Sequence, residues 1–238
     1  MRSLKLVWLA GLAATPALFA NVCVPDTLAD YIALGAQGCS VGSFNVEDFG
    51  FSILLSTRHL SSSDILVTPV ESGDSVALIF DSPTKQLKVG IDSTIDILIS
   101  YFWDPGTIRS AGQVMNDPVT APGLAELTVN GCENSNFING VCPTTGFTSV
   151  LAIDDSTKTT VASTEVFTTL VTTLGIEDEI DIEGRQCHPP PGSNTCADIV
   201  NFENVLETTP EPSTWILGLI PAGGGIWMGL RRRRGHSR

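Results

Sequence analysis

The chain has 238 residues, of which 26 are acidic and 13 basic, and 42% are hydrophobic. Seven of the basic residues lie near the two ends of the chain, which leaves six basic against 26 acidic residues and a net charge of −20 for residues 21–212. Because so acidic a surface repels nucleic acids, the composition excludes DNA and RNA as expected partners.

The first 20 residues, MRSLKLVWLAGLAATPALFA, have the three parts of a secretory signal peptide. Arg2 and Lys5 form a basic start, an apolar run follows from Leu6, and small residues stand at Ala17 and Ala20. The pattern predicts a signal peptide over residues 1–20, with cleavage after Ala20 or, alternatively, after Ala17. An uncleaved N-terminal anchor is the competing interpretation, although the apolar run is short for a full membrane span.

Residues 21–206 form the predicted extracytoplasmic domain, which is long enough to bury one core. The segment PDTLADYIALG predicts a short helix capped by Thr27 and ending at Gly35. The segment STIDILISYFW (93–103) alternates, with Ile95, Ile97, Ile99 and Tyr101 on one face. Similar runs recur between turn-like breaks such as DSPTK and DPGT, so we expect an all-β fold, a single antiparallel β-sandwich.

Six cysteines stand in three sequence-local pairs. In an exported chain an even number of cysteines indicates disulfides, and six allow 15 pairings. Nearest-neighbour pairing predicts Cys23–Cys39, Cys132–Cys142 and Cys187–Cys196, each worth about 2–3 kcal/mol by closing a loop. Zinc is the alternative, but the pairs lack the close C-x₂-C spacing and histidine partners of structural zinc sites.

Acidic residues gather in IEDEIDIEG (176–184), which contains Glu177, Asp178, Glu179, Asp181 and Glu183, and at Asp154-Asp155. Alternation of isoleucine with acidic residues is typical of the solvated face of a sheet, which we favour over a calcium site. No EF-hand loop is present, and we expect no cofactor and no metal. Paired carboxylates can hydrolyse glycosides, but nothing in the sequence separates catalytic from surface acids.

The string GCSVG (38–42) matches the G-x-S-x-G pattern of a hydrolase nucleophile elbow, with Ser40 as nucleophile. That elbow requires a strand before the serine and a helix after it, whereas here a predicted helix comes first and a predicted strand follows. His59 and His188 are the only histidines downstream in the domain. We therefore expect no catalytic activity.

The end of the chain, TPEPSTWILGLIPAGGGIWMGLRRRRGHSR, combines three features. The polar stretch NFENVLETTPEPST (201–214) is typical of a linker, and we place the linker proper at residues 207–214. Residues 215–230 form the predicted transmembrane helix, 16 uncharged residues that include a proline and three consecutive glycines. The basic tail, residues 231–238, should remain in the cytoplasm under the positive-inside rule, with Arg231, Arg232, Arg233 and Arg234 as the stop-transfer cluster.

Pro210, Glu211 and Pro212, followed by an apolar span and an arginine cluster, resemble the PEP-CTERM sorting signal of Gram-negative bacteria. The resemblance implies recognition and processing by an exosortase, a membrane-embedded cysteine protease or transpeptidase. The segment LADYIALGAQGCSVGSFNVEDFGF (28–51) is also similar to the beginning of many small PEP-CTERM proteins. Such proteins are exported or surface-associated, often in organisms that make exopolysaccharide.

Together these patterns predict an exported surface or extracellular-matrix protein without catalytic activity. Its expected partners are the export machinery, an exosortase, the membrane through the C-terminal segment and extracellular polysaccharide. The predicted route is an intermediate anchored in the inner membrane that then reaches the cell surface or the medium. The alternative is a secreted carbohydrate-binding or carbohydrate-active protein that uses the same tail.

Overall fold

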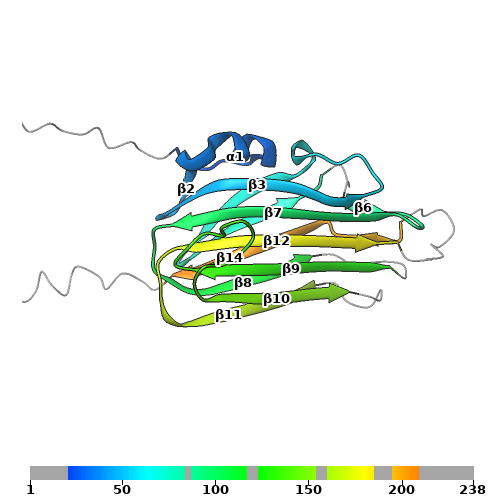
Figure 1. Ribbon diagram of the computed structural model, residues 1–238. Helices are drawn as coiled ribbons and strands as arrows, with labels where there is room; N and C mark the ends of the chain where they lie inside the picture. Colours follow the sequence, from blue (N-terminus) through cyan, green and yellow to red (C-terminus); the bar gives the residue numbers. More distant parts are fainter. Residues whose placement is uncertain (1–20, 84–86, 117–122, 154–159, 185–194, 209–238) are drawn as a thin grey trace, which may run out of the picture.

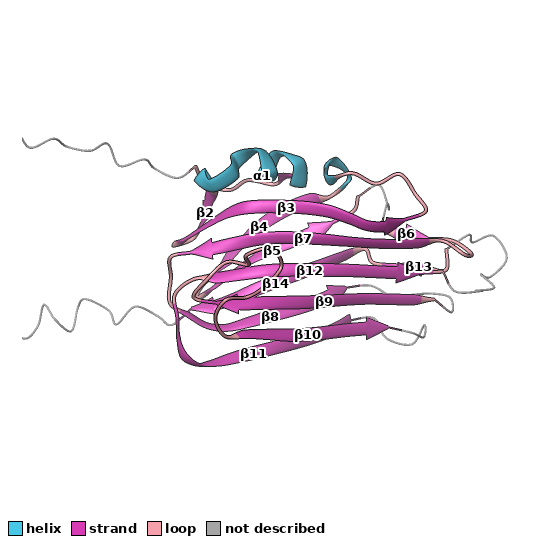
Figure 2. Cartoon of the chain, viewed as in Figure 1, coloured by secondary structure: helices cyan, strands magenta, loops and turns pink. Residues whose placement is uncertain are grey.

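Two antiparallel sheets lie face to face in the computed structural model, and one short helix covers one side of the pair (Figure 1; Figure 2). The structure describes residues 21–83, 87–116, 123–153, 160–184 and 195–208. Sheet A has the strand order β10-β9-β12-β7-β3-β2, and sheet B has the order β1-β4-β5-β14-β8-β11. A small two-stranded ribbon, β13-β6, completes the described strands. The predicted mostly β, antiparallel sandwich is thus confirmed.

The elements follow one another along the chain with these bounds. They are β1 (Asp26–Thr27), α1 (Leu28–Leu34), η1 (Gly35–Gln37), β2 (Cys39–Val41), β3 (Phe44–Ser56), η2 (Ser62–Asp64), β4 (Leu66–Ser72), β5 (Ser75–Asp81), β6 (Lys88–Val89), β7 (Thr94–Asp104), β8 (Ile108–Asn116), β9 (Leu124–Glu133), β10 (Gly146–Ile153), β11 (Thr160–Val171), β12 (Leu174–Glu183), β13 (Ala197–Asp198) and β14 (Asn201–Thr208).

The core lies between the sheets, and strand β7 shows why the sequence folds this way. Its buried positions are Ile95, Ile97, Ile99, Tyr101 and Trp103, and the residues between them are partly exposed. This strict alternation is the period of a strand with one solvated face, and it confirms the predicted face of residues 93–103. From the opposite sheet, Phe80 of β5 stacks on Phe202 of β14 and also contacts Tyr101 of β7 in a tilted arrangement.

Helix α1 has the predicted bounds and caps. The Thr27 side chain accepts a hydrogen bond from the Asp30 amide at 3.2 Å, and Gly35 ends the helix at φ 56°. Thr27 is thus a side-chain N-cap, and Gly35 has the positive φ that glycine adopts most readily. Tyr31 is buried and meets Phe49 of β3 edge-to-face at 5.0 Å between ring centroids, so the helix covers this side of the sandwich (Figure 1).

Residues 201–208 are not a linker, contrary to the prediction for the stretch beginning at Asn201. They form strand β14, which pairs with β5 on one side and β8 on the other. Phe202, Asn204 and Leu206 point into the core, while Glu203, Val205 and Glu207 face outward. The polar composition of the outward face concealed an alternating strand, and the folded domain therefore extends to Thr208.

Two of the predicted disulfides are confirmed. Cys23 is bonded to Cys39 and Cys132 to Cys142. Cys196 is also disulfide-bonded, whereas its predicted partner, Cys187, lies outside the described residues. In the described part of the chain, no helix has the length and apolarity to cross a membrane. The predicted signal peptide, the Pro-Glu-Pro motif, the transmembrane segment, the arginine cluster and Asp154-Asp155 all lie outside the described residues.

The first and last described residues lie at the same end of the sandwich (Figure 1). Val22 bridges to Ser40 of β2, and β2 pairs with the start of β3, which in turn pairs with Asp104 at the end of β7. A short turn later, Ile108 begins β8 and pairs with Thr208 at the end of β14. The two ends of the domain are therefore joined by a chain of neighbouring residues at this end of the sandwich.

Candidate functional site

A shallow groove lies on the outer face of sheet B, over strands β14, β8 and β11. Its volume is about 190 Å³. The lining residues alternate along the three strands, as residues on one face of a sheet must. They are Ser110, Gly112, Val114, Ala162, Thr164, Val205 and Glu207, together with Gln113 and Ser163.

Gly112 forms the floor of the groove. It stands directly between Val205 of β14 and Thr164 of β11 in the strand register. A Cβ atom added at Gly112 would meet its nearest neighbours, including Thr164 Oγ1, at 3.6 Å or more, which is ordinary van der Waals contact. The hollow therefore exists because residue 112 has no side chain, and a larger residue would fill it without straining the strand.

The rim of the groove is polar. The Ser110 hydroxyl donates to Glu207 Oε2 at 2.9 Å across the β8–β14 pair. Thr164 and Glu207 are exposed, whereas Ser110 is buried beneath the rim. An apolar floor with hydroxyl and carboxylate groups at its margin suits a ligand with both C–H faces and hydroxyl groups, because each surface meets its counterpart. None of the residues lining the groove is aromatic, so stacking contributes nothing there.

A second cavity, of about 220 Å³, lies between the N-terminal segment and α1. Its polar groups already have partners within the fold. The Tyr31 hydroxyl donates to the Val24 carbonyl at 2.8 Å, and Asp30 accepts from the hydroxyl of the N-cap residue Thr27. That hydrogen bond holds the pKa of Asp30 below its usual value, while burial and nearby Asp26 raise the pKa of Tyr31. We therefore assign these groups to folding rather than to ligand binding.

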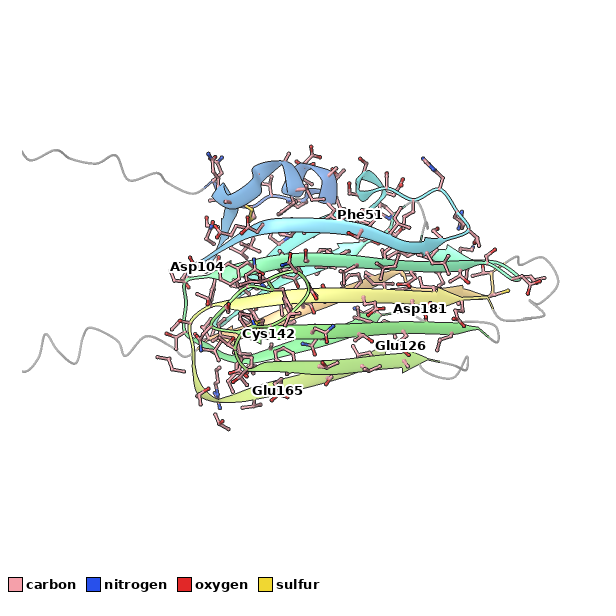
Figure 3. All side chains as sticks on the ribbon, viewed as in Figure 1. Phe51, Asp104, Glu126, Cys142, Glu165 and Asp181 are labelled. Atoms are coloured by element: carbon pink, nitrogen blue, oxygen red, sulfur yellow. A yellow bond between two sulfur atoms is a disulfide. The ribbon has the colours of Figure 1, made fainter. Side chains whose placement is uncertain are left out.

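The outer face of sheet A carries the predicted acidic surface. Asp181 of β12 stands between Glu126 of β9 and Asp96 of β7 in one lateral row, and Figure 3 shows Asp181 and Glu126 side by side. Partial burial raises the pKa of Asp96 and of Glu177. Among the residues that the structure describes, no three histidine, cysteine or acidic side chains are placed to hold a metal ion. The described part of this face therefore gives no support to the calcium alternative.

Asp178 is the exception on β12, because it points into the core instead of joining the solvated acidic face. The residue is 0% exposed. Asn204 Nδ2 donates both to Asp178 Oδ2, at 2.7 Å, and to the Tyr101 hydroxyl oxygen, at 2.6 Å. Burial raises the pKa of Asp178 well above its usual value, although its hydrogen bonds to Asn204 and Tyr101 oppose the shift. The sequence of β12 indicates this burial, because Asp178 lies two residues from both Ile176 and Ile180 and therefore faces the same side of the strand.

Ser40 does not occupy a nucleophile elbow. It lies within the short strand β2, after α1 and η1, and its amide donates to the Asn21 carbonyl at 2.8 Å. The order is thus helix before strand, the reverse of the elbow's strand-turn-helix. His188 lies outside the described residues, so the structure does not place it relative to Ser40.

No protein-family model and no curated protein matches the chain. Among solved structures, it is similar to a carbohydrate-binding module in complex with β-1,4-galactotriose, at 9% identity and a TM-score of 0.27 over 67% of this chain and 84% of that one. It is also similar to a family 11 carbohydrate-binding module from Clostridium thermocellum in complex with a mixed-linked tetrasaccharide, at 10% identity and a TM-score of 0.21 over 79% and 99%.

A third similar structure is an arabinose-bound α-L-arabinofuranosidase, at 13% identity and a TM-score of 0.28 over 79% of this chain and 26% of that one. TM-scores of this size do not establish a common fold, and none of these identities defines a ligand for this chain. The groove must therefore be interpreted from its own residues.

Proposed function

We propose that this chain is an exported, non-catalytic protein whose sandwich binds a neutral polysaccharide through the groove over Gly112. The observation that carries the proposal is the combination of an apolar floor, at Gly112 and Val205, with a polar rim, at Thr164 and Glu207. Sugar rings present C–H faces and hydroxyl groups together, and this surface offers a counterpart to each.

The charge of the protein narrows the class of polysaccharide. Residues 21–212 carry a net charge of −20, so an anionic polysaccharide would be repelled over the whole surface. A neutral polysaccharide is not repelled in this way. Because the groove is shallow and lacks an aromatic platform, we expect weak binding at each site and a preference for polymers over short oligosaccharides.

The lining also favours binding over hydrolysis. Glycosidases that follow the usual mechanism place two carboxyl groups on either side of the scissile bond. Among the residues lining the groove, Glu207 is the only acidic one, and its Oε2 atom already accepts the Ser110 hydroxyl. A single engaged carboxylate suits recognition of a sugar hydroxyl.

Delivery by the PEP-CTERM-like tail is the second part of the proposal. Disulfides form in oxidising compartments outside the cytoplasm, and the two described here suit a secreted domain. Since the domain begins and ends at the same end of the sandwich, the predicted signal peptide and the predicted membrane segment attach to that one end. A linker leaving β14 there would present Pro210, Glu211 and Pro212 close to the membrane, where an exosortase acts.

The binding proposal is tested with the protein recovered after export, by affinity electrophoresis in gels that contain neutral glucans, galactans or arabinans. We expect retardation by at least one of them, loss of retardation in Gly112→Leu, and normal retardation in Thr148→Ala on the outer face of sheet A. Alginate serves as the anionic control and should cause no retardation. Absence of retardation in every neutral gel, or full retardation of Gly112→Leu, would overturn the groove as a glycan site.

A further inference from the structure

In the described part of the chain, no other element covers the edge of the sandwich formed by β10 and β11, and this edge has almost no charge. They are the terminal strands of sheets A and B, respectively, and they lie next to each other on the side opposite α1 (Figure 1). Phe147 of β10 and Phe167 of β11 meet there at 5.8 Å between ring centroids. We call β10 and β11 together the β10/β11 edge.

The composition of this edge sets it apart from the rest of the domain. Strand β10, GFTSVLAI, contains no charged residue, and β11, TVASTEVFTTLV, contains only Glu165 (Figure 3). Neither strand contains proline, lysine or arginine. Val150 is 55% exposed and Val166 is 60% exposed. An edge strand presents unpaired backbone N–H and C=O groups, and natural proteins protect such edges with charges, proline or bulges. Strand β11 has one such irregularity, a register shift between Val166 and Val171, whereas the register of β10 is unbroken.

The opposite edge shows these protective features. Strand β3 has register shifts between Glu47 and Gly50 and again between Ile53 and Leu55, and α1 packs against it. Strand β4 contains Pro69, which has no N–H to donate, and β1 pairs with its first residues. The two sides therefore differ in the regularity of their strands, since β3 is irregular where β10 is regular, although Ile53, Leu54 and Leu55 of β3 are also exposed.

We propose that the β10/β11 edge pairs with the same edge of a second copy of this chain, antiparallel about a two-fold axis. Two bodies that each carry a net charge of −20 repel one another over most of their surfaces, so association requires a region without charge. Strand β10 provides one, because it contains no charged residue. It also pairs with β9 in unbroken register over all eight residues, so no bulge interrupts its outer edge.

The symmetry makes Val150 the most informative position. A two-fold axis beside the middle of β10 places Val150 close to Val150 of the second copy, on the same face of the joined sheet. Two lysines introduced there would face each other directly. A lysine at Val166 tests in the same way whether β11 contributes to the dimer.

Electrostatics gives a second expectation. Because the remaining charges of the two copies repel, salt should strengthen the dimer, whereas a dimer held by complementary charges would weaken. Raising ionic strength from about 0.01 M to about 1 M shortens the Debye length from about 30 Å to about 3 Å. The dimer does not require the groove to bind anything, so its failure and the failure of the glycan proposal are separate results.

The test is sedimentation velocity on the protein recovered after export, over a range of concentrations and salt. We expect a species of about twice the mass of the chain, at least a tenfold weaker dimer in Val150→Lys and Val166→Lys, and an unchanged dimer in Leu54→Lys. Leu54 is a matched control because it is 53% exposed on β3, at the opposite edge. Circular dichroism confirms that each variant is folded.

Amide hydrogen exchange on the unmodified protein keeps the test independent of the variants. Exchange in β10 should slow as concentration rises, while exchange in β3 stays constant. A monomer at every concentration and salt, a dimer that survives both lysine variants, or a dimer whose formation leaves β10 exchange unchanged would each overturn the proposal.

Discussion

Asn204 Nδ2 donates to Asp178 Oδ2 at 2.7 Å, and this hydrogen bond crosses the core from sheet B to sheet A. The same amide nitrogen lies 2.6 Å from the Tyr101 hydroxyl oxygen, so one side chain of β14 joins two strands of the opposite sheet. Asp178 Oδ1 and Asn204 Oδ1 are buried, and neither has a hydrogen-bond partner among the residues that the structure describes. Burial in such surroundings penalises the charged form of a carboxyl group and so favours its neutral form.

Asp178→Asn should flatten the pH dependence of stability. Burial raises the folded pKa of Asp178 above the ordinary value of 3.8. Its contribution is therefore fully present below that value and is lost as pH rises through the folded pKa, by at most about 1.4 kcal/mol per pH unit. The unmodified protein should lose stability relative to the variant as pH rises above about 4. Urea unfolding at a series of pH values measures this difference.

Asp74→Asn is the matched control for this experiment, since Asp74 is an exposed turn residue. Its difference from the unmodified protein should stay small across the same pH range. Parallel pH curves for the unmodified protein and Asp178→Asn would show that Asp178 is not held neutral in the core.

Loss of the Cys23–Cys39 disulfide should destabilise the domain by about 3 kcal/mol, because the bond closes a loop with a sequence separation of 16 residues. The double variant Cys23→Ser/Cys39→Ser is unfolded in urea and followed by the fluorescence of Trp103, the only tryptophan between residues 21 and 208. An unchanged midpoint and slope would contradict a stabilising role for this disulfide.

Gly106→Ala should be destabilising by about 1–3 kcal/mol, the usual cost of overpacking a core. An added Cβ would lie 1.8 Å from the Phe44 ring, and Phe44 is itself buried against Trp103 at 5.9 Å between ring centroids. Gly112→Ala is the comparison, because its Cβ would make only ordinary contacts. Equal thermal midpoints for the two variants would contradict the packing described around Phe44.

Processing of the tail predicts a defined mass. The protein released from cells should lack Arg231, Arg232, Arg233 and Arg234, since cleavage near the Pro-Glu-Pro motif removes everything beyond it. Replacement of Pro210, Glu211 and Pro212 by alanine should retain the chain in the membrane fraction with its arginines. Intact-mass spectrometry distinguishes these forms, and a released protein that still carries the four arginines would contradict sorting by this tail.

Local sequence signals predicted the parts of the fold that depend on one element. Thr27 and Gly35 set the bounds of α1, and the isoleucines of β7 set its buried face, because caps and alternation act over a few residues. The pattern of β14 is harder to recognise, because Asn204 is polar although it is buried and the strand ends just before a proline-rich stretch. Asp178 was assigned to the surface with its acidic neighbours, although its register with Ile176 and Ile180 places it inside.

The groove could not be predicted from sequence. Gly112, Thr164 and Val205 come from strands that are distant along the chain, and only the register of β11, β8 and β14 brings them into one row. The same holds for the β10/β11 edge, since the order of strands in the two sheets is needed to show that both strands are terminal. Sequence patterns identify faces of strands, but the neighbours of each strand follow from the whole topology.

The central claim, that the groove over Gly112 binds a neutral polysaccharide, is tested most directly by an NMR titration of the isotope-labelled protein. The ligand is an oligosaccharide from whichever neutral polysaccharide retards the protein. We expect shifts concentrated at the amides of Gly112, Thr164 and Val205, and no shifts at these positions in Gly112→Leu. Shifts confined to the acidic outer face of sheet A or to the cavity beside α1 would contradict it.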